Sequence, residues 1–179
     1  MKKQTNTTKL ILSAMFLALS YVLPFLTGQI PQIGARLCPM HIPVILCGFI
    51  CGAPWGALVG FVAPLIRSIT LGMPTLFPKA VAMAFELCVY GGLTGIMYRV
   101  MPKKRWSIYC SLLIAMIGGR LVWGAVQLLC VGLDLSKFGF AAFWAGSIAN
   151  AVPGIILQIV VIPIIVMLYE KSKLSSGRL

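Results

Sequence analysis

Long apolar runs alternate with short polar, glycine- or proline-containing breaks along the whole chain. Most runs are close to the roughly 20 residues that an α-helix needs to cross a bilayer. The breaks hold residues that do not continue a helix, such as the Gly-Ala-Pro turn at residues 52–54. The pattern predicts six transmembrane helices, over residues 9–26, 40–52, 55–71, 78–98, 106–131 and 140–169.

The composition supports a membrane protein. Of the 179 residues, 60% are hydrophobic and 10% are charged, whereas a soluble domain has about 25% charged residues. Six spans with short connections use the whole length, so we expect one integral membrane domain over residues 1–179 and no soluble catalytic domain. Because the chain contains no GxxxxGK[ST] sequence, it is not expected to hydrolyse ATP by itself. The predicted fold class is an all-α membrane protein.

The basic residues indicate membrane orientation rather than nucleic-acid binding. The formal net charge is +12, but ten of the fifteen lysines and arginines flank predicted spans on one side. An excess of lysine and arginine is typical of the cytoplasmic side of a membrane protein. We therefore predict that both termini are cytoplasmic. The residues concerned are Lys2, Lys3, Lys9, Arg99, Lys103, Lys104, Arg105, Lys171, Lys173 and Arg178.

The first span has two further features. Its basic start is also typical of a cleaved signal peptide, but the apolar run is long and lacks a clear A-x-A cleavage site, which favours a retained helix. Ala14 and Ala18 lie four residues apart on this span. Small residues at that spacing let another helix approach closely. The pair therefore predicts either a docking face for a partner or ordinary packing inside the bundle.

Four charged residues in or beside the predicted spans are candidate ligand-binding residues: Arg67, Lys79, Glu86 and Arg120. A charge at a helix centre costs roughly 2.5–3.5 kcal/mol on insertion scales, so such residues usually face a cavity, a partner or a substrate path. Lys79 and Glu86 are seven residues apart, which predicts that they share one helix face. Arg67 and Lys79 are expected near the outer surface and Arg120 near mid-membrane.

These charges have a structural and a functional interpretation. In the structural one, Glu86 pairs with Arg120 or Lys79, and Arg67 or Lys79 extends to lipid headgroups. One acid cannot neutralise three cations, however, so a cavity shared by all four would keep a surplus of two positive charges. The N-terminal dipole of the fourth helix would add to this surplus. The functional interpretation is therefore a site for an anionic ligand, such as a small carboxylic acid, that enters from outside.

Other polar residues give weaker signals. Asn150 could hydrogen-bond an amide or hydroxyl group of a ligand, or it could join two helices. His41 is expected in a structural hydrogen bond near the outer surface, far in depth from Glu86. Cys38 and His41 could begin a metal site, but no second pair of ligands accompanies them. The other cysteines are interpreted as small apolar packing residues, and no metal or cofactor is predicted.

The order of these features resembles that of an S component, the substrate-binding membrane subunit of an energy-coupling factor (ECF) vitamin transporter. The similarity covers nearly the whole chain. Its combination of segments is typical of this superfamily and most similar to the pantothenate-type branch, whereas the AxxxA element alone is unspecific. The segments are AMFLA (14–18), PMHIPVILCGF (39–49), GALVGFVAPLIRS (56–68), GMPTLFPKAVAMAFELCVYG (72–91), GGRLVWG (118–124) and NAVPGI (150–155).

The resemblance implies a multi-pass subunit of the bacterial plasma membrane with no ATPase of its own. Ala14 and Ala18 would dock onto a transmembrane coupling protein that carries two ATP-binding cassette subunits. The subunit would topple in the bilayer and carry its vitamin from the outer to the inner face. Residues 28–38 would form a lid over the site.

The ligand would lie among the outer halves of helices four, five and six. Pantothenate is the expected substrate. Its carboxylate would meet Arg67 or Lys79, and its hydroxyl and amide groups would meet Arg120, Glu86 and Asn150.

Three alternatives remain at the level of sequence. Another vitamin, riboflavin- or pyridoxine-like, could be the ligand, although the excess of cations without a clear aromatic stacking cluster disfavours a flavin. An intramembrane enzyme is disfavoured because no HExxH or GxSxG sequence occurs and because His41 is expected far from Glu86. A membrane scaffold without a ligand would retain the docking helix but would leave the outer cations unexplained.

Overall fold

The computed structural model describes residues 5–27, 39–102, 104–130, 132, 144 and 152–175. Within these residues the regular secondary structure is helical and includes no strand. The elements are α1 (Asn6–Val22), η1 (Leu23–Thr27), α3 (His41–Cys51), α4 (Ala53–Leu71), η2 (Leu76–Ala80), α5 (Val81–Val100), α6 (Arg105–Cys130) and α8 (Val152–Ser175).

Most of these helices have the length and apolar character of membrane spans. α3 is apolar too, but its 11 residues extend about 17 Å, short of the ~30 Å hydrocarbon core. The outer faces carry exposed apolar side chains such as Ile69 and Val100, as expected for contact with lipid. These properties confirm the predicted all-α membrane fold. Within the described residues, five segments are long enough to cross: Asn6–Phe25, Ala53–Leu71, Leu76–Val100, Arg105–Cys130 and Val152–Ser172.

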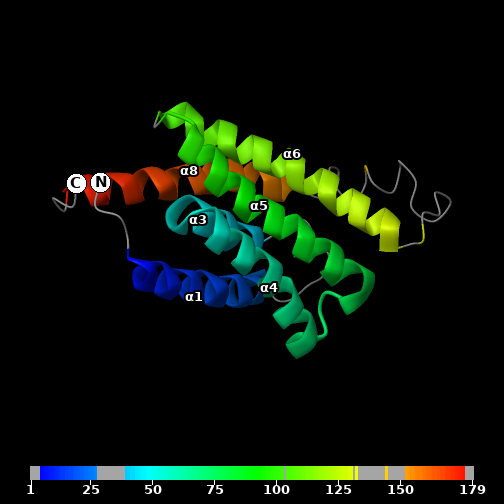
Figure 1. Cartoon of the computed structure of the whole chain (residues 1–179). Helices are drawn as coiled ribbons and strands as arrows, with labels where there is room; N and C mark the ends of the chain where they lie inside the picture. Colours follow the sequence, from blue (N-terminus) through cyan, green and yellow to red (C-terminus); the bar gives the residue numbers. More distant parts are fainter. Residues whose placement is uncertain are drawn as a thin grey trace.

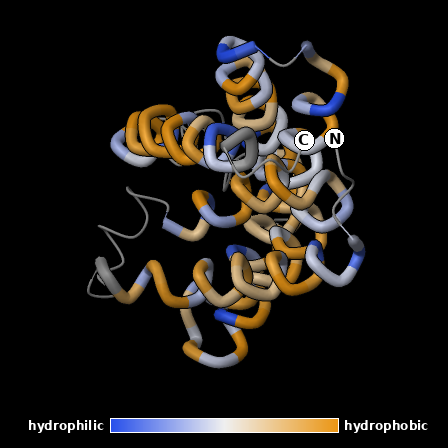
Figure 2. The backbone as a smooth tube through the Cα atoms, turned by 90° about the vertical axis from the view of Figure 1, so that its left-hand side faces the viewer, coloured by the Kyte–Doolittle hydropathy of each residue, from blue (hydrophilic) through white to orange (hydrophobic). Residues whose placement is uncertain are grey.

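Successive helices alternate in direction, so α1, α4 and α6 start at the same end of the bundle at which α3, α5 and α8 finish (Figure 1). Side chains join these helices there: the Phe49 and Tyr98 rings lie 5.1 Å apart, and the Tyr98 hydroxyl donates to Glu170. Seen from this end, hydrophobic stretches run through the helical bundle, with hydrophilic residues in short stretches between them (Figure 2). We call it the basic end, because it carries exposed Arg99, Lys104, Arg105 and Lys171.

α5 lies at the centre of the bundle, against α3, α4 and α6 (Figure 1). Its contact with α4 brings the two backbones together at glycines. A Cβ atom at Gly91 would lie 2.2 Å from the carbonyl oxygen of Gly56, and one at Gly60 would lie 2.2 Å from that of Leu87. No side chain larger than hydrogen fits such a contact, which sets the rotation of α5 about its axis. This rotation directs Glu86, five residues before Gly91, into the bundle.

Three predicted helices differ in detail from the structure. The helix predicted over residues 9–26 is α-helical from Asn6 to Val22 and continues as the 3-10 helix η1. The helix predicted over residues 78–98 has an irregular first turn, η2, in which Phe77 is extended (φ −117°, ψ 134°), and the regular helix begins at Val81. α8 continues to Ser175, beyond the predicted end at residue 169. The predicted start of that helix at residue 140, the outer loop at residues 28–38, and Asn150 lie outside the described residues.

Candidate functional site

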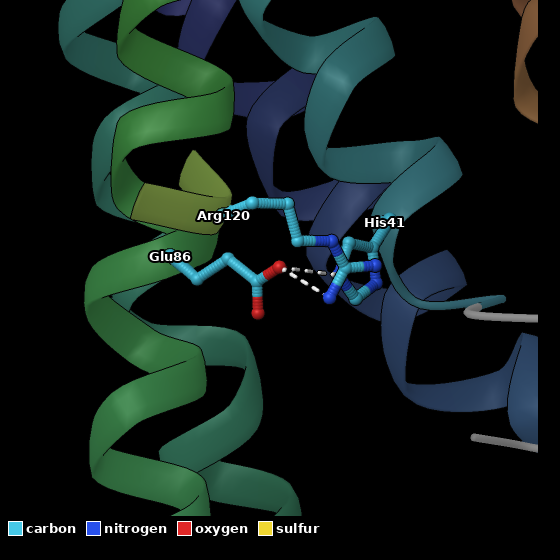
Figure 3. A network of polar contacts seen from close by, with 3 residues as sticks. All are labelled: His41, Glu86 and Arg120. Carbon is cyan, nitrogen blue, oxygen red and sulfur yellow. Dashed lines mark ion pairs between the residues drawn. The ribbon is translucent and has the colours of Figure 1, made fainter. Parts of the chain in front are cut away.

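His41 of α3, Glu86 of α5 and Arg120 of α6 meet in the interior of the bundle, between three helices (Figure 3). We call these three residues the polar cluster. Glu86 Oε1 lies 2.9 Å from Arg120 Nη1 and 3.7 Å from His41 Nε2. The side chains of Glu86 and His41 are only 3% and 2% exposed, and that of Arg120 is 15% exposed. An acid and its two basic neighbours are thus enclosed in an apolar bundle.

Small and aromatic residues shape the surroundings of the cluster. Glu86 and Tyr90 are four residues apart on α5 and share its buried face. The Tyr90 ring lies beside the His41 ring, with centroids 5.3 Å apart and planes inclined by 59°. Gly119 makes room for this arrangement, because a Cβ atom there would lie 2.6 Å from the Tyr90 ring and 3.1 Å from the Glu86 carbonyl oxygen. Arg120 follows directly and is thereby brought against α5.

The position of His41 corrects the expectation that it lies far in depth from Glu86. His41 is the first residue of α3, and α3 is too short to reach both surfaces of a bilayer. Its first residue therefore lies inside the bundle, where the imidazole is buried and 3.7 Å from Glu86. The sequence signal that could have placed it was available, since residues 40–52 are too few for a full span. His41 is accordingly a site residue that the sequence analysis missed.

The electrostatics of the cluster are closely balanced. The Arg120–Glu86 ion pair offsets the cost of burying each charge, and loss of one partner from such a pair costs about 3–5 kcal/mol. Its hydrogen bonding is incomplete, however. Neither Glu86 Oε1 nor either ring nitrogen of His41 has a hydrogen-bond partner of good geometry among the described residues. The 2.9 Å contact is therefore mainly a charge contact, and polar capacity is left for a further group.

Arg67, a predicted site residue, is buried elsewhere. Its Nη1 donates to the carbonyl oxygen of Tyr21 over 3.1 Å, and its guanidinium lies 5.6 Å from the centre of the Phe25 ring. Tyr21 belongs to the last turn of α1, whose carbonyl groups lack partners within the helix and attract a cation. Burial of a charged guanidinium is unfavourable, and the contacts of Arg67 with Tyr21 and Phe25 offset this cost. Arg67 thus ties α4 to the end of α1.

Lys79 does not share the environment of Glu86. It is exposed, whereas Glu86 is buried, because the irregular turn η2 interrupts the helical spacing between them. Among the described residues, Glu86 forms ion pairs with His41 and Arg120 and not with Lys79 or Arg67. The four predicted charges therefore do not form one contacting group. Asn150, the fifth predicted residue, lies outside the described residues.

Ala14 and Ala18 are exposed on the face of α1 that points away from the bundle. The buried residues of α1 are Ser13, Phe16 and Ser20, which lie on its other face. Among the described residues, the two alanines are therefore not packed inside the bundle. They form a smooth strip that another helix could approach closely.

The described residues contain no group of three or more histidine, cysteine, aspartate or glutamate side chains that could hold a metal ion. Cys38, the other half of the weak metal signal at His41, is not among them. The five described cysteines are free, and Cys47 and Cys51 pack in the core. The cluster can therefore supply hydrogen bonds and charge, with one acid, one permanent cation and one imidazole facing one another.

Comparison with known proteins agrees with this arrangement of apolar helices around a small polar interior. No curated protein and no solved structure matches the chain. The family of the ECF transporter substrate-specific component matches over residues 8–166, which covers every helix of the bundle except the last turns of α8 and the first residues of α1. The protein therefore belongs to the family of substrate-specific components of ECF transporters.

Proposed function

We propose that this substrate-specific component binds a small anionic vitamin, with pantothenate as the favoured ligand, and delivers it inward together with an energising ATPase module. Family membership establishes a substrate-specific transporter component of the membrane. The identity of the ligand and the partner module are the proposed parts. The observation that carries the ligand proposal is the polar cluster.

The polar cluster supports a ligand site because it places ionisable groups in the apolar interior of the bundle. Ionisable groups inside a membrane protein are costly, and where they occur they usually serve transport paths or binding sites. Well-packed apolar residues commonly replace a buried ion pair with no loss of stability, so stability alone does not account for one. Here the pair also carries a buried histidine with unsatisfied ring nitrogens. In a substrate-specific component, such groups suit a polar ligand.

The charge balance supports an anion. Among the described residues, the half of the bundle away from the basic end holds the cations Arg67, Lys79 and Arg120 and one acid, Glu86. Because Arg67 is already engaged with Tyr21, we assign the ligand carboxylate to Arg120. Arg67 and Lys79 then supply positive potential that attracts the anion.

The remaining polar groups of the ligand would use hydrogen bonds rather than charge. Glu86 would accept from a hydroxyl group, and His41 would meet a hydroxyl or amide group. Asn150 would hydrogen-bond the amide group of the ligand. Pantothenate combines a carboxylate, hydroxyls and one amide, which matches this set of groups.

The exposed strip on α1 supports docking to the energising module. Ala14 and Ala18 lie on the outer face of the helix and expose little side chain beyond the backbone. We propose that this face contacts a transmembrane coupling protein that carries two ATP-binding cassette subunits. The polar cluster would then bind the ligand, and the strip on α1 would contact the energising module.

Calorimetric titration of the purified protein with a vitamin panel tests the proposed ligand. We expect one-to-one binding of pantothenate and a loss of about tenfold to a hundredfold in affinity for Arg120→Gln, the value of one charged hydrogen bond. Lys79→Gln is the matched control, since it also removes one cation but at an exposed position, and should change the affinity by less than about threefold.

The other outcomes separate the alternatives. Binding of a riboflavin- or pyridoxine-like compound in place of pantothenate would retain the transporter role and remove the pantothenate assignment. Binding of a neutral vitamin would contradict the charge argument. An absence of binding across the whole panel would favour a scaffold that docks through α1 without a ligand.

A further inference from the structure

Glu86 Oε1 lies between two basic groups that compete for it. Arg120 Nη1 of α6 is the nearer at 2.9 Å, and His41 Nε2 of α3 is 3.7 Å away (Figure 3). A carboxylate oxygen can exchange one such partner for the other through a small movement of its side chain. The geometry therefore allows a second arrangement, in which Glu86 contacts the imidazole in place of the guanidinium.

These two arrangements differ by one proton. With a neutral imidazole, Arg120 and Glu86 cancel each other and the cluster has no net charge. A carboxylate ligand that enters this neutral cluster adds one uncompensated negative charge beside Glu86, in a site that is almost fully buried. Burial of an unpaired charge is strongly unfavourable, and the two carboxylates would also repel each other. Uptake of one proton removes both costs.

We propose, resting on the proposed function, that the anionic ligand enters this site together with one proton, which His41 accepts. The proton from the surrounding water forms the Nε2–H bond of an imidazolium, and no covalent bond of the ligand changes. The imidazolium then forms the ion pair with Glu86, and the Arg120 guanidinium binds the ligand carboxylate in place of Glu86. The occupied site then contains two cations and two anions and is again neutral. His41 is thus a positioning residue that controls the availability of Arg120.

Few other titratable groups face His41. α5 contributes Glu86 and Tyr90, and α6 contributes Arg120, which pairs with Glu86. Arg67 of α4 contacts Tyr21 and Phe25 instead. The acid of α8, Glu170, lies at the basic end beside Tyr98. Within the described residues, Glu86 is therefore the acid that can form an ion pair with the His41 imidazolium.

The chain contains a single histidine, so its imidazole can be followed directly. We would label histidine with ¹⁵N, carry a purification tag without histidine, and record the ring nitrogen shifts of the detergent-purified protein at about pH 7.5. The ligand-free protein should show a neutral ring. Saturating pantothenate should convert it to an imidazolium.

A variant provides the same test without any ligand. In Arg120→Gln, Glu86 loses its guanidinium partner, so its carboxylate is free for His41 and the ring should be protonated at the same pH. In Arg120→Gln/Glu86→Gln, the acid that lies beside the ring is removed, so the ring should be neutral. Circular dichroism verifies that the variants remain helical. If Arg120→Gln unfolds, Arg120→Lys replaces it, because a shorter cation should leave a larger protonated fraction on His41 than the wild-type guanidinium does.

Calorimetry in buffers of different ionisation enthalpy then counts protons. Proton uptake on binding of pantothenate predicts that the affinity falls as the pH rises. Glu86→Gln, in which Glu86 no longer holds Arg120 by charge, should bind with no proton uptake and little pH dependence. His41→Gln should lose the proton uptake and bind weakly across the whole range.

The results separate this proposal from the proposed function. A neutral ring in Arg120→Gln, or binding of pantothenate without proton uptake, overturns the partner exchange. A protonated ring in Arg120→Gln together with failure of pantothenate to bind supports the exchange and removes pantothenate as the substrate.

Discussion

Gly91→Ala is the sharpest test of how the bundle places its polar cluster. A Cβ atom at Gly91 would lie 2.2 Å from the carbonyl oxygen of Gly56 and 2.3 Å from its carbonyl carbon. Both are backbone atoms of α4, so no side-chain rotation can relieve the contact. The substitution must push α5 away from α4, and Glu86 lies on the displaced helix.

The expected cost follows from this geometry. Overpacking of a core by a methyl group typically costs 1–3 kcal/mol, and a rigid backbone neighbour places this case near about 3 kcal/mol. Alanine regains up to about 1 kcal/mol over glycine within a helix. The net destabilisation is about 2–3 kcal/mol. For a chain of this size that lowers the melting temperature by roughly 4–12 °C, at about 2–4 °C per kcal/mol.

The neighbouring glycine provides the control. At Gly92 the nearest atom to an added Cβ is the Ala57 Cβ at 3.7 Å, an ordinary contact. Gly92→Ala should therefore leave stability unchanged or raise it slightly. Both variants and the wild type would be melted in one detergent, without ligand, and followed by far-ultraviolet circular dichroism. Melting temperatures of the two variants within about 2 °C of each other would refute the backbone contact between α4 and α5.

Three further predictions concern residues outside the polar cluster. Arg67→Gln should lower stability by about 2 kcal/mol through loss of the Tyr21 and Phe25 contacts. It should change the pantothenate affinity by less than about threefold. A hundredfold loss of affinity would identify Arg67 as the carboxylate ligand. Tyr98→Phe should lower stability by about 1–2 kcal/mol and have much less effect in Glu170→Gln, which a thermal double-mutant cycle measures. Ala14→Trp should leave melting and pantothenate affinity unchanged, because the position is exposed, but should abolish co-purification with the coupling protein. Retained co-purification would place docking elsewhere.

The sequence by itself determined the membrane class and the succession of helices. Each apolar run is a local property, because a helix in lipid satisfies its own backbone and needs no partner to be recognised. The residue types of the site were also visible, since Glu86 and Arg120 are charges in apolar surroundings. The pairing of Glu86 with Arg120 was one of two structural alternatives that the sequence left open.

The tertiary structure decided which side chains meet. Helix rotation is set by backbone contacts such as Gly91 against Gly56, and helix depth by the shortness of α3, which brings His41 beside Glu86. The rotation of α1 also places Ala14 on its exposed face. Arg67 donates a hydrogen bond to the Tyr21 carbonyl oxygen at the end of α1. Hydropathy contains little of this information, because a span can rotate and shift by several residues while remaining equally apolar, and only close packing against its neighbours selects one arrangement.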